Sequence, residues 1–246
     1  MKSRYTKTGF VQIGKNTFLL IFILFLWVES SVLLYGQSVV LGEFQKIRTV
    51  GDVSVELIHS TENKATYSIQ KGFERDLAFD IKEDVLTIKV KAPENAKYNR
   101  LVTKASVKLY YKELREITIS ALSSVSTKDT LVSPFLRISA RKGSKGTFVL
   151  KCFDLKIDAI QKATVYLQGK TETLKLEAGT HSVIVAESLY AKEIEVLVNS
   201  ESRVSAYAEK AIYGQVSTGG KLNYKGSPQY KNIQSESGGF VKGPND

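Results

Sequence analysis

The feature that most constrains the fold is a spaced repeat in the second half of the chain. From Leu114 onward, short alternating segments recur about every 19 residues, at spacings of 19, 19, 19, 20 and 18. Each segment opens on an apolar anchor, and these anchors are Ile117, Leu136, Leu155, Leu174, Ile194 and Ile212. A second apolar position follows roughly ten residues later, at Val125, Phe148, Val165, Val183, Val204 and Leu222. A short period with two strands per copy is typical of a solenoid, whose coils bury equivalent apolar positions against one another.

The first half of the chain, from Phe44 to Lys112, lacks this repeat and alternates strictly between apolar and polar residues. The pattern is clear in GDVSVELIHS and in KASVKLYYK. Such alternation predicts half-buried strands, which we interpret as ordinary antiparallel β structure. We therefore expect an all-β fold, with an antiparallel β region over 37–112 followed by a solenoid over 113–242. The alternative is a β-sandwich with evenly spaced hairpins, but six regular copies favour the solenoid.

The N-terminus has the three parts of a secretory signal peptide. Lys2, Arg4, Lys7 and Lys15 precede an apolar run, TFLLIFILFLWV, and the pattern predicts a cut between Gly36 and Gln37. The alternative is an uncleaved anchor, although 12 apolar residues before Glu29 fall short of the roughly 20 that span a bilayer. We expect segment 1–36 to be removed, with no stable membrane insertion afterwards. The protein would then reside in the periplasm, on the outer-membrane surface or outside the cell.

Composition narrows the possible partners. A single cysteine, Cys152, allows no disulfide within the chain. The formal net charge is +10, but lysines and arginines are scattered singly rather than clustered in a stripe. Nucleic-acid binding is therefore not expected. The two histidines, His59 and His181, lie in different halves without ligands at metal-site spacing, so we expect neither a metal nor a cofactor.

An enzyme is the main competing interpretation, because β-helix folds often carry polysaccharide lyases or hydrolases. Such chemistry needs converging carboxylates. Asp154 and Asp158 are the only closely spaced pair at the start of a coil. We interpret the matching positions of neighbouring coils as Leu, Lys or Thr, so no stacked acidic patch is expected. No residue is assigned a catalytic role.

Tyrosines in the repeat half are candidates for ligand contact. An aromatic row could stack on sugar rings or anchor a protein partner. The alternative is that each tyrosine covers a half-buried strand. As possible ligand-face residues we select Tyr166, Tyr207 and Tyr224.

Three stretches resemble a known family. They are FQKIRTVGDVSVELIHSTENKATYSI, VKLYYKELREITISALSSVST and LNYKGSPQYKNIQSESGGFVK. Together, from about Gly42 to Lys242, the chain resembles the putative auto-transporter adhesin, head GIN domain family of secreted Gram-negative proteins. The resemblance implies a right-handed β-helix-like stack, and it supplies no catalytic residues. The chain departs from the family pattern at several corners, where Ser-Gly repeats are replaced by residues such as Ala121 and Leu122.

The last of these stretches is expected to close the solenoid. The capping residues would be Tyr224, Gly226, Pro228, Gly238 and Gly239. Phe240 and Val241 would add one more strand, and 243–246 would be a frayed tail. A terminal cap of this kind protects the open end of a repeat stack.

These observations favour an exported, non-enzymatic envelope or surface protein. We expect an adhesin-like solenoid that binds a glycan or a surface protein. A carbohydrate-active enzyme and a self-assembling structural protein, with homo-oligomers, are the alternatives.

Overall fold

The computed structural model describes residues 37–91 and 102–244, so the predicted signal segment lies outside the described residues. Within those ranges, no helix is both long and apolar enough to cross a bilayer. One short 3-10 helix, Glu74–Asp76, is present. The strands are β1 Gln37–Val40, β2 Lys46–Val50, β3 Val53–His59, β4 Lys64–Lys71, β5 Leu77–Lys82, β6 Val85–Val90, β7 Lys104–Tyr111, β8 Glu116–Ser120, β9 Ser124–Thr127, β10 Leu131–Arg141, β11 Lys145–Ile160, β12 Thr164–Gly179, β13 Val183–Val198, β14 Arg203–Val216, β15 Lys221–Lys225, β16 Tyr230–Ser235 and β17 Phe240–Lys242.

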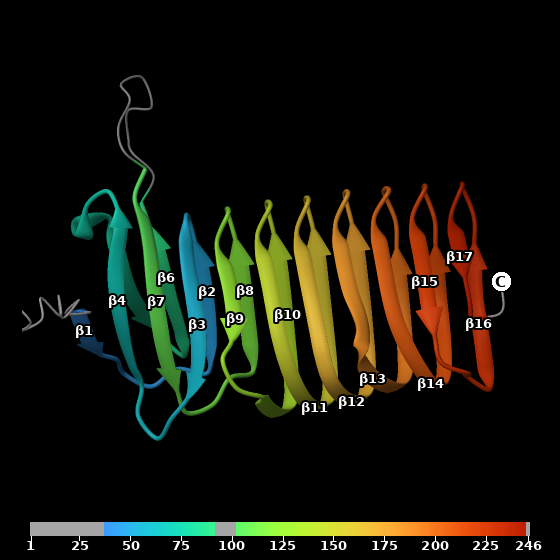
Figure 1. The fold of residues 1–246 in the computed structure, drawn as a ribbon, viewed down its shortest axis with the longest axis horizontal. Helices are drawn as coiled ribbons and strands as arrows, with labels where there is room; N and C mark the ends of the chain where they lie inside the picture. The colour runs from blue at the N-terminus through green and yellow to red at the C-terminus, as the bar shows by residue number, and fades with distance from the viewer. Residues whose placement is uncertain (1–36, 92–101, 245–246) are drawn as a thin grey trace, which may run out of the picture. The chain divides into compact units, whose positions relative to one another are not determined.

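The repeat half is a parallel solenoid, as predicted. Each of the long strands β11 to β14 runs along one face, bends, and returns along the other face (Figure 1). We call the face built from β2, β6, β8, β16 and the second halves of the long strands the return face. We call the row of bends the bend edge and the row of tight turns opposite it the turn edge. In Figure 1 the turn edge lies at the top.

The predicted anchors stack in register and are buried. Leu136 pairs with Leu155, and the column continues through Leu174, Ile194 and Ile212. The first anchor was misplaced by two residues, because Ile117 pairs with Ile138 rather than with Leu136. The connection between β9 and β10 lengthens this coil, so its inner positions recur after more than 19 residues.

Two members of the second apolar set were also misassigned. Val125 is opposite Gly146 rather than Phe148. A Cβ on Gly146 would lie 2.6 Å from Cε2 of Phe148, so the Phe148 ring occupies the space that a side chain would fill. Val183 points outward, and its neighbour Ile184 is the fully buried residue of that coil.

The N-terminal part contains less antiparallel pairing than expected. Antiparallel ladders join β1 to β4, β4 to β7 and β5 to β6. The strands β2, β3, β6 and β7 instead pair in parallel and extend the solenoid. The layer β2–β3 lies between β6–β7 and β8–β9, so Ile47 is opposite both Leu86 and Ile117. Apolar alternation is the same in parallel and antiparallel strands, which is why the sequence pattern misled us.

The turn edge consists of stacked two-residue turns. Within the described chain, seven turns place two consecutive residues at positive φ: 121–122, 142–143, 161–162, 180–181, 200–201, 218–219 and 237–238. Backbone bonds link successive turns, as from Lys162 N to Thr180 O at 2.9 Å and from His181 N to Ser200 O at 2.9 Å. Two left-handed residues define a type I′ turn, which usually selects Gly or Asn. Here the stacked turn ladder holds other residues in that conformation.

The C-terminal stretch forms another layer of the stack. The strand β16 pairs in parallel with β14, and β17 with β15. Gly226 has φ +92°, and a Cβ there would lie 2.0 Å from the Ala208 oxygen, so glycine is required. Gly238 is the second residue of the last turn. Pro228 and Gly243 are buried, so the tail is not frayed from 243, and residues 245–246 lie outside the described part.

Candidate binding site at the bend edge

The bends are held by a column of small hydrogen-bond donors. Ser133 Oγ donates to Phe135 O at 2.8 Å, Cys152 Sγ to Asp154 O at 3.0 Å, and Thr171 Oγ1 to Thr173 O at 2.9 Å. Each also reaches a carbonyl of the preceding coil. Cys152 is therefore a structural donor that replaces a hydroxyl. Burial raises the pKa of its thiol, which keeps it protonated and unreactive at neutral pH.

The regular register breaks at one place along the bend edge. Between β12 and β13 it shifts at Tyr166/Gln168, and between β13 and β14 it shifts at Ala186/Tyr190 and at Ala191/Glu193. These shifts fall in the copies whose anchors are spaced by 20 and 18 residues. An extra residue in a strand re-aims the neighbouring side chains, and bulges of this kind often lie beside functional sites.

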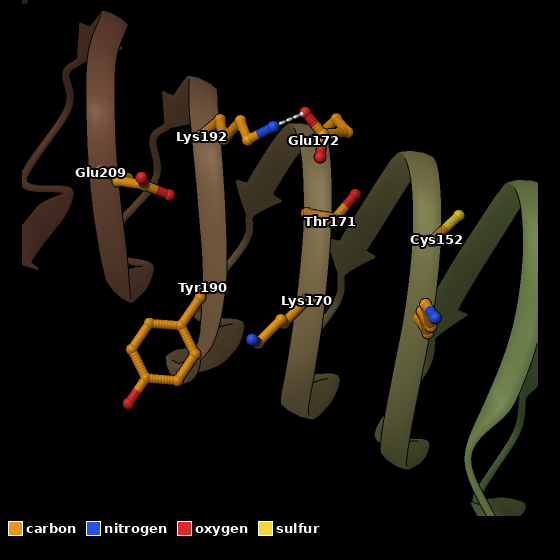
Figure 2. A pocket seen from close by; sticks show the side chains of 8 residues that line it. Cys152, Lys170, Thr171, Glu172, Tyr190, Lys192 and Glu209 are labelled. Atoms are coloured by element: carbon orange, nitrogen blue, oxygen red, sulfur yellow. Dashed lines mark hydrogen bonds and ion pairs between the residues drawn. The ribbon is translucent and has the colours of Figure 1, made fainter.

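A depression of about 380 Å³ lies beside this irregularity (Figure 2). Its lining residues are Lys151, Cys152, Lys170, Thr171, Glu172, Tyr190, Lys192 and Glu209. The Tyr190 ring projects from β13, and Lys170 extends toward it from β12. Tyr190 is 49% exposed and packs edge-to-face on Tyr207, with ring centroids 4.8 Å apart. The depression thus combines an open aromatic surface with polar groups.

Opposite charges organise the floor and rim of the depression. Lys192 pairs with Glu172, and this hydrogen bond raises the pKa of the Lys192 ammonium. Nearby, Lys225 pairs with Glu187 and lowers the pKa of that carboxyl. In register along the edge stand Lys151, Lys170, Tyr190, Tyr207 and Lys225, so lysines flank the two tyrosines on both sides. Such a row offers ring stacking together with hydrogen-bond donors.

The three tyrosines selected from the sequence do not converge. Tyr207 does lie at the bend edge, against Tyr190. Tyr166 lies on the other broad face, where Lys145 Nζ stands 5.4 Å from its ring centroid. Tyr224 was wrong as a ligand-face residue, because it is 7% exposed and packs inside the stack. Sequence reasoning did not select Tyr190, although the 20-residue spacing pointed to its coil.

The closely spaced carboxylates do not form a catalytic pair. Four residues along a strand span about 13 Å, whereas the carboxyls that flank a glycosidic bond stand about 5–9.5 Å apart. Asp158 is held by Arg137 at 3.2 Å and Lys156 at 3.5 Å. Asp154 Oδ1 accepts a hydrogen bond from Thr173.

The residue opposite Asp158 is Glu177, which corrects the expectation of Leu, Lys or Thr at the matching positions. Burial by itself raises the pKa of Glu177. The hydrogen bond from Lys156 and the charges of Lys156 and Lys175 outweigh burial and lower it. A general acid needs a raised pKa, so this carboxyl is unsuited to that role.

Neither histidine lies near the depression. His59 packs edge-to-face against Tyr111, and His181 occupies the turn edge beside Glu201. In the part of the chain that the structure describes, no three His, Cys, Asp or Glu residues are grouped for a metal ion.

The fold and the sequence together place the chain in a family. Residues 43–228 match the family described as putative auto-transporter adhesin, head GIN domain, and the chain belongs to that family. A comparison with curated proteins found no match.

Solved structures share the same fold. A putative adhesin from Bacteroides fragilis is 20% identical with a TM-score of 0.73, covering 84% of this chain and 95% of its own. A putative adhesin from Parabacteroides merdae is 17% identical with a TM-score of 0.66, covering 84% and 94%. A protein from Parabacteroides distasonis described as a putative lipid binding protein is 16% identical with a TM-score of 0.60, covering 84% and 95%.

Proposed function

We propose that this protein is an exported, non-enzymatic, adhesin-like protein of the cell envelope or surface, and that it binds a glycan at the bend edge. Export is supported by the basic and apolar pattern of the first 36 residues. An adhesin-like role is supported by the family to which the chain belongs.

The observation that carries glycan binding is the pair of tyrosines beside the lysine-flanked depression. Sugar rings present apolar faces that suit aromatic side chains, and their hydroxyls suit lysine and carboxylate partners. The coils on either side continue in register, so the ladder holds the side chains in place without a ligand. Preorganisation of this kind lowers the entropy cost of binding.

A glycan array followed by titration of the retained sugar tests the proposal. Tyr190→Ala should weaken binding by about tenfold, because a buried aromatic contact contributes roughly 1–2 kcal/mol. Tyr166→Ala is the matched control and should leave the affinity unchanged. If Tyr166→Ala weakened binding and Tyr190→Ala did not, the site would belong on the broad face instead. Silence on the array would contradict glycan binding.

A second candidate function, self-assembly, is favoured by the C-terminal layer. Among the described residues, β16 and β17 each have a partner strand on one side only, and Tyr230 and Phe240 are 73% and 52% exposed. Unpaired strand edges are templates for pairing with another chain. Sedimentation over a range of concentrations should then show association that Tyr230→Lys reduces. A monomer at every concentration would exclude this function.

A further inference from the structure

A row of charges runs along the return face and neutralises itself over most of its length. Lys156 Nζ lies 3.0 Å from Glu177, and Lys175 Nζ lies 2.6 Å from Glu195. Arg137 Nε lies 3.2 Å from Asp158. Each cation here pairs with a carboxylate of the next coil, so this part of the face carries little uncompensated charge.

The compensation stops at Asp158. Moving toward the N-terminal coils, the residues in register with Asp158 are Ser139, then Thr118, then Arg48. Hydroxyl groups therefore replace the carboxylates, and an arginine takes the next position. Arg141, which is opposite Ser120, and its neighbour Lys142 add two further cations close by.

A depression of about 440 Å³ lies over this part of the return face. Its lining residues are Arg48, Glu116, Thr118, Ser120, Arg137, Ser139, Arg141 and Lys142, four cations against one carboxylate. Within residues 37–91 and 102–244, the side chains of Arg48, Arg141 and Lys142 make no ion pair or hydrogen bond. Three neighbouring strands thus direct unpaired cations toward a hollow whose base carries hydroxyl groups.

Arginine selects the chemistry of a ligand here. A guanidinium presents a planar set of donors that matches a carboxylate, sulfate or phosphate through two parallel hydrogen bonds. The Thr118 hydroxyl adds a donor between the arginines. An oxyanion placed in the hollow would take the part that Asp158 and Glu177 play further along the face.

We propose that this depression, on the return face and separate from the bend edge, binds an oxyanion carried by a sugar chain. The proposal rests on the proposed function only for the source of the anion. It deepens that function by assigning sulfated or uronic-acid glycans as the ligand class and by adding a second contact surface.

Titration of the purified protein with two probes, a sulfated oligosaccharide and an oligogalacturonate, tests this site. The double variant Arg48→Gln/Arg141→Gln should weaken binding of at least one probe by about tenfold, as expected for lost charge-assisted hydrogen bonds. High salt should weaken wild-type binding in the same direction. Arg48→Lys/Arg141→Lys, which keeps the charge but not the planar donors, should show a smaller loss.

The matched control is Lys210→Gln/Lys231→Gln, which removes the same charge from two exposed positions elsewhere. It should change the affinity by less than about twofold, because distant exposed charges are screened. Equal losses in both double variants, with melting temperatures preserved, would show diffuse charge attraction and overturn the site. Unchanged affinity in the arginine variant, or binding of inorganic sulfate but of neither oligosaccharide, would overturn it too.

Tyr190→Ala separates the two proposals in the same titration. Retained arginine-dependent binding together with no effect of Tyr190→Ala on any glycan would remove the bend-edge site and keep this one. Tyr190-dependent binding of a neutral glycan, with no response to the arginine variant, would remove only the oxyanion site.

Discussion

At the scale of single residues, Cys152 shows how a repeat determines the role of a side chain. Ser133 and Thr171 occupy the equivalent bends and donate to equivalent carbonyl groups. Cys152→Ser should therefore change the unfolding free energy by less than about 1 kcal/mol, whereas Cys152→Ala should cost roughly 1 kcal/mol through an unmade hydrogen bond. Urea denaturation measures both. A serine variant less stable than the alanine variant would contradict the donor role.

Tyr111 predicts a loss of stability in alkaline solution. Burial, and secondly the charge of Asp129, raise the pKa of Tyr111 from 10.0 to about 12. Because the folded pKa is the higher one, its contribution to stability is complete below pH 10 and is lost as pH rises toward 12. Tyr111→Phe should flatten the fall in melting temperature across that range. Parallel curves for the two proteins would show that Tyr111 does not contribute.

At the scale of elements, the stacked turns store backbone strain. Thr180 has φ 54°, a left-handed conformation that is unfavourable for a β-branched residue. Thr180→Asn should raise stability by about 1 kcal/mol, because Asn tolerates this conformation. Thermal unfolding checks it against Thr173→Asn, in an extended strand, where no gain is expected. Equal effects at both positions would show that the turn is not strained.

The strands themselves were predictable where the signal was local. The anchors from Leu136 to Ile212 follow from spacing alone, because each coil must bury the same inner positions. The pairing of β2 and β3 with strands from either side did not follow, since Ile47 meets Leu86 and Ile117 through contacts far apart in sequence. The position of Tyr224 could not be predicted either, because alternation does not show which face of the strand is inside.

At the scale of the whole described stack, each layer contributes through contact with its neighbours. Removing residues from Gly226 onward deletes β16 and β17 and exposes Tyr224, with Ile233 and Val241 lost from the core. The melting temperature should fall by about 5–10 °C, from several kcal/mol of lost apolar burial. Circular dichroism should still show β structure, because repeat stability is roughly additive. An unchanged melting temperature would contradict a structural role for the last layer.

The bend-edge site emerges only at this scale, because it depends on an irregular register within a regular stack. The unequal spacings of 20 and 18 were visible in the sequence, but not the side to which Tyr190 would turn. The cationic depression was hidden for a similar reason. Arg48 and Arg141 are far apart in the chain and scattered among other basic residues, and the inserted β2–β3 layer brings them to one surface.

Hydrogen exchange with and without a glycan retained on the array tests binding at the bend edge most directly. For a neutral glycan, we predict added protection confined to the segment around Tyr190 and the adjoining bends of β12 and β14, with none around Tyr166. Protection spread over the broad face, or no change at saturating ligand, would contradict binding at the bend edge.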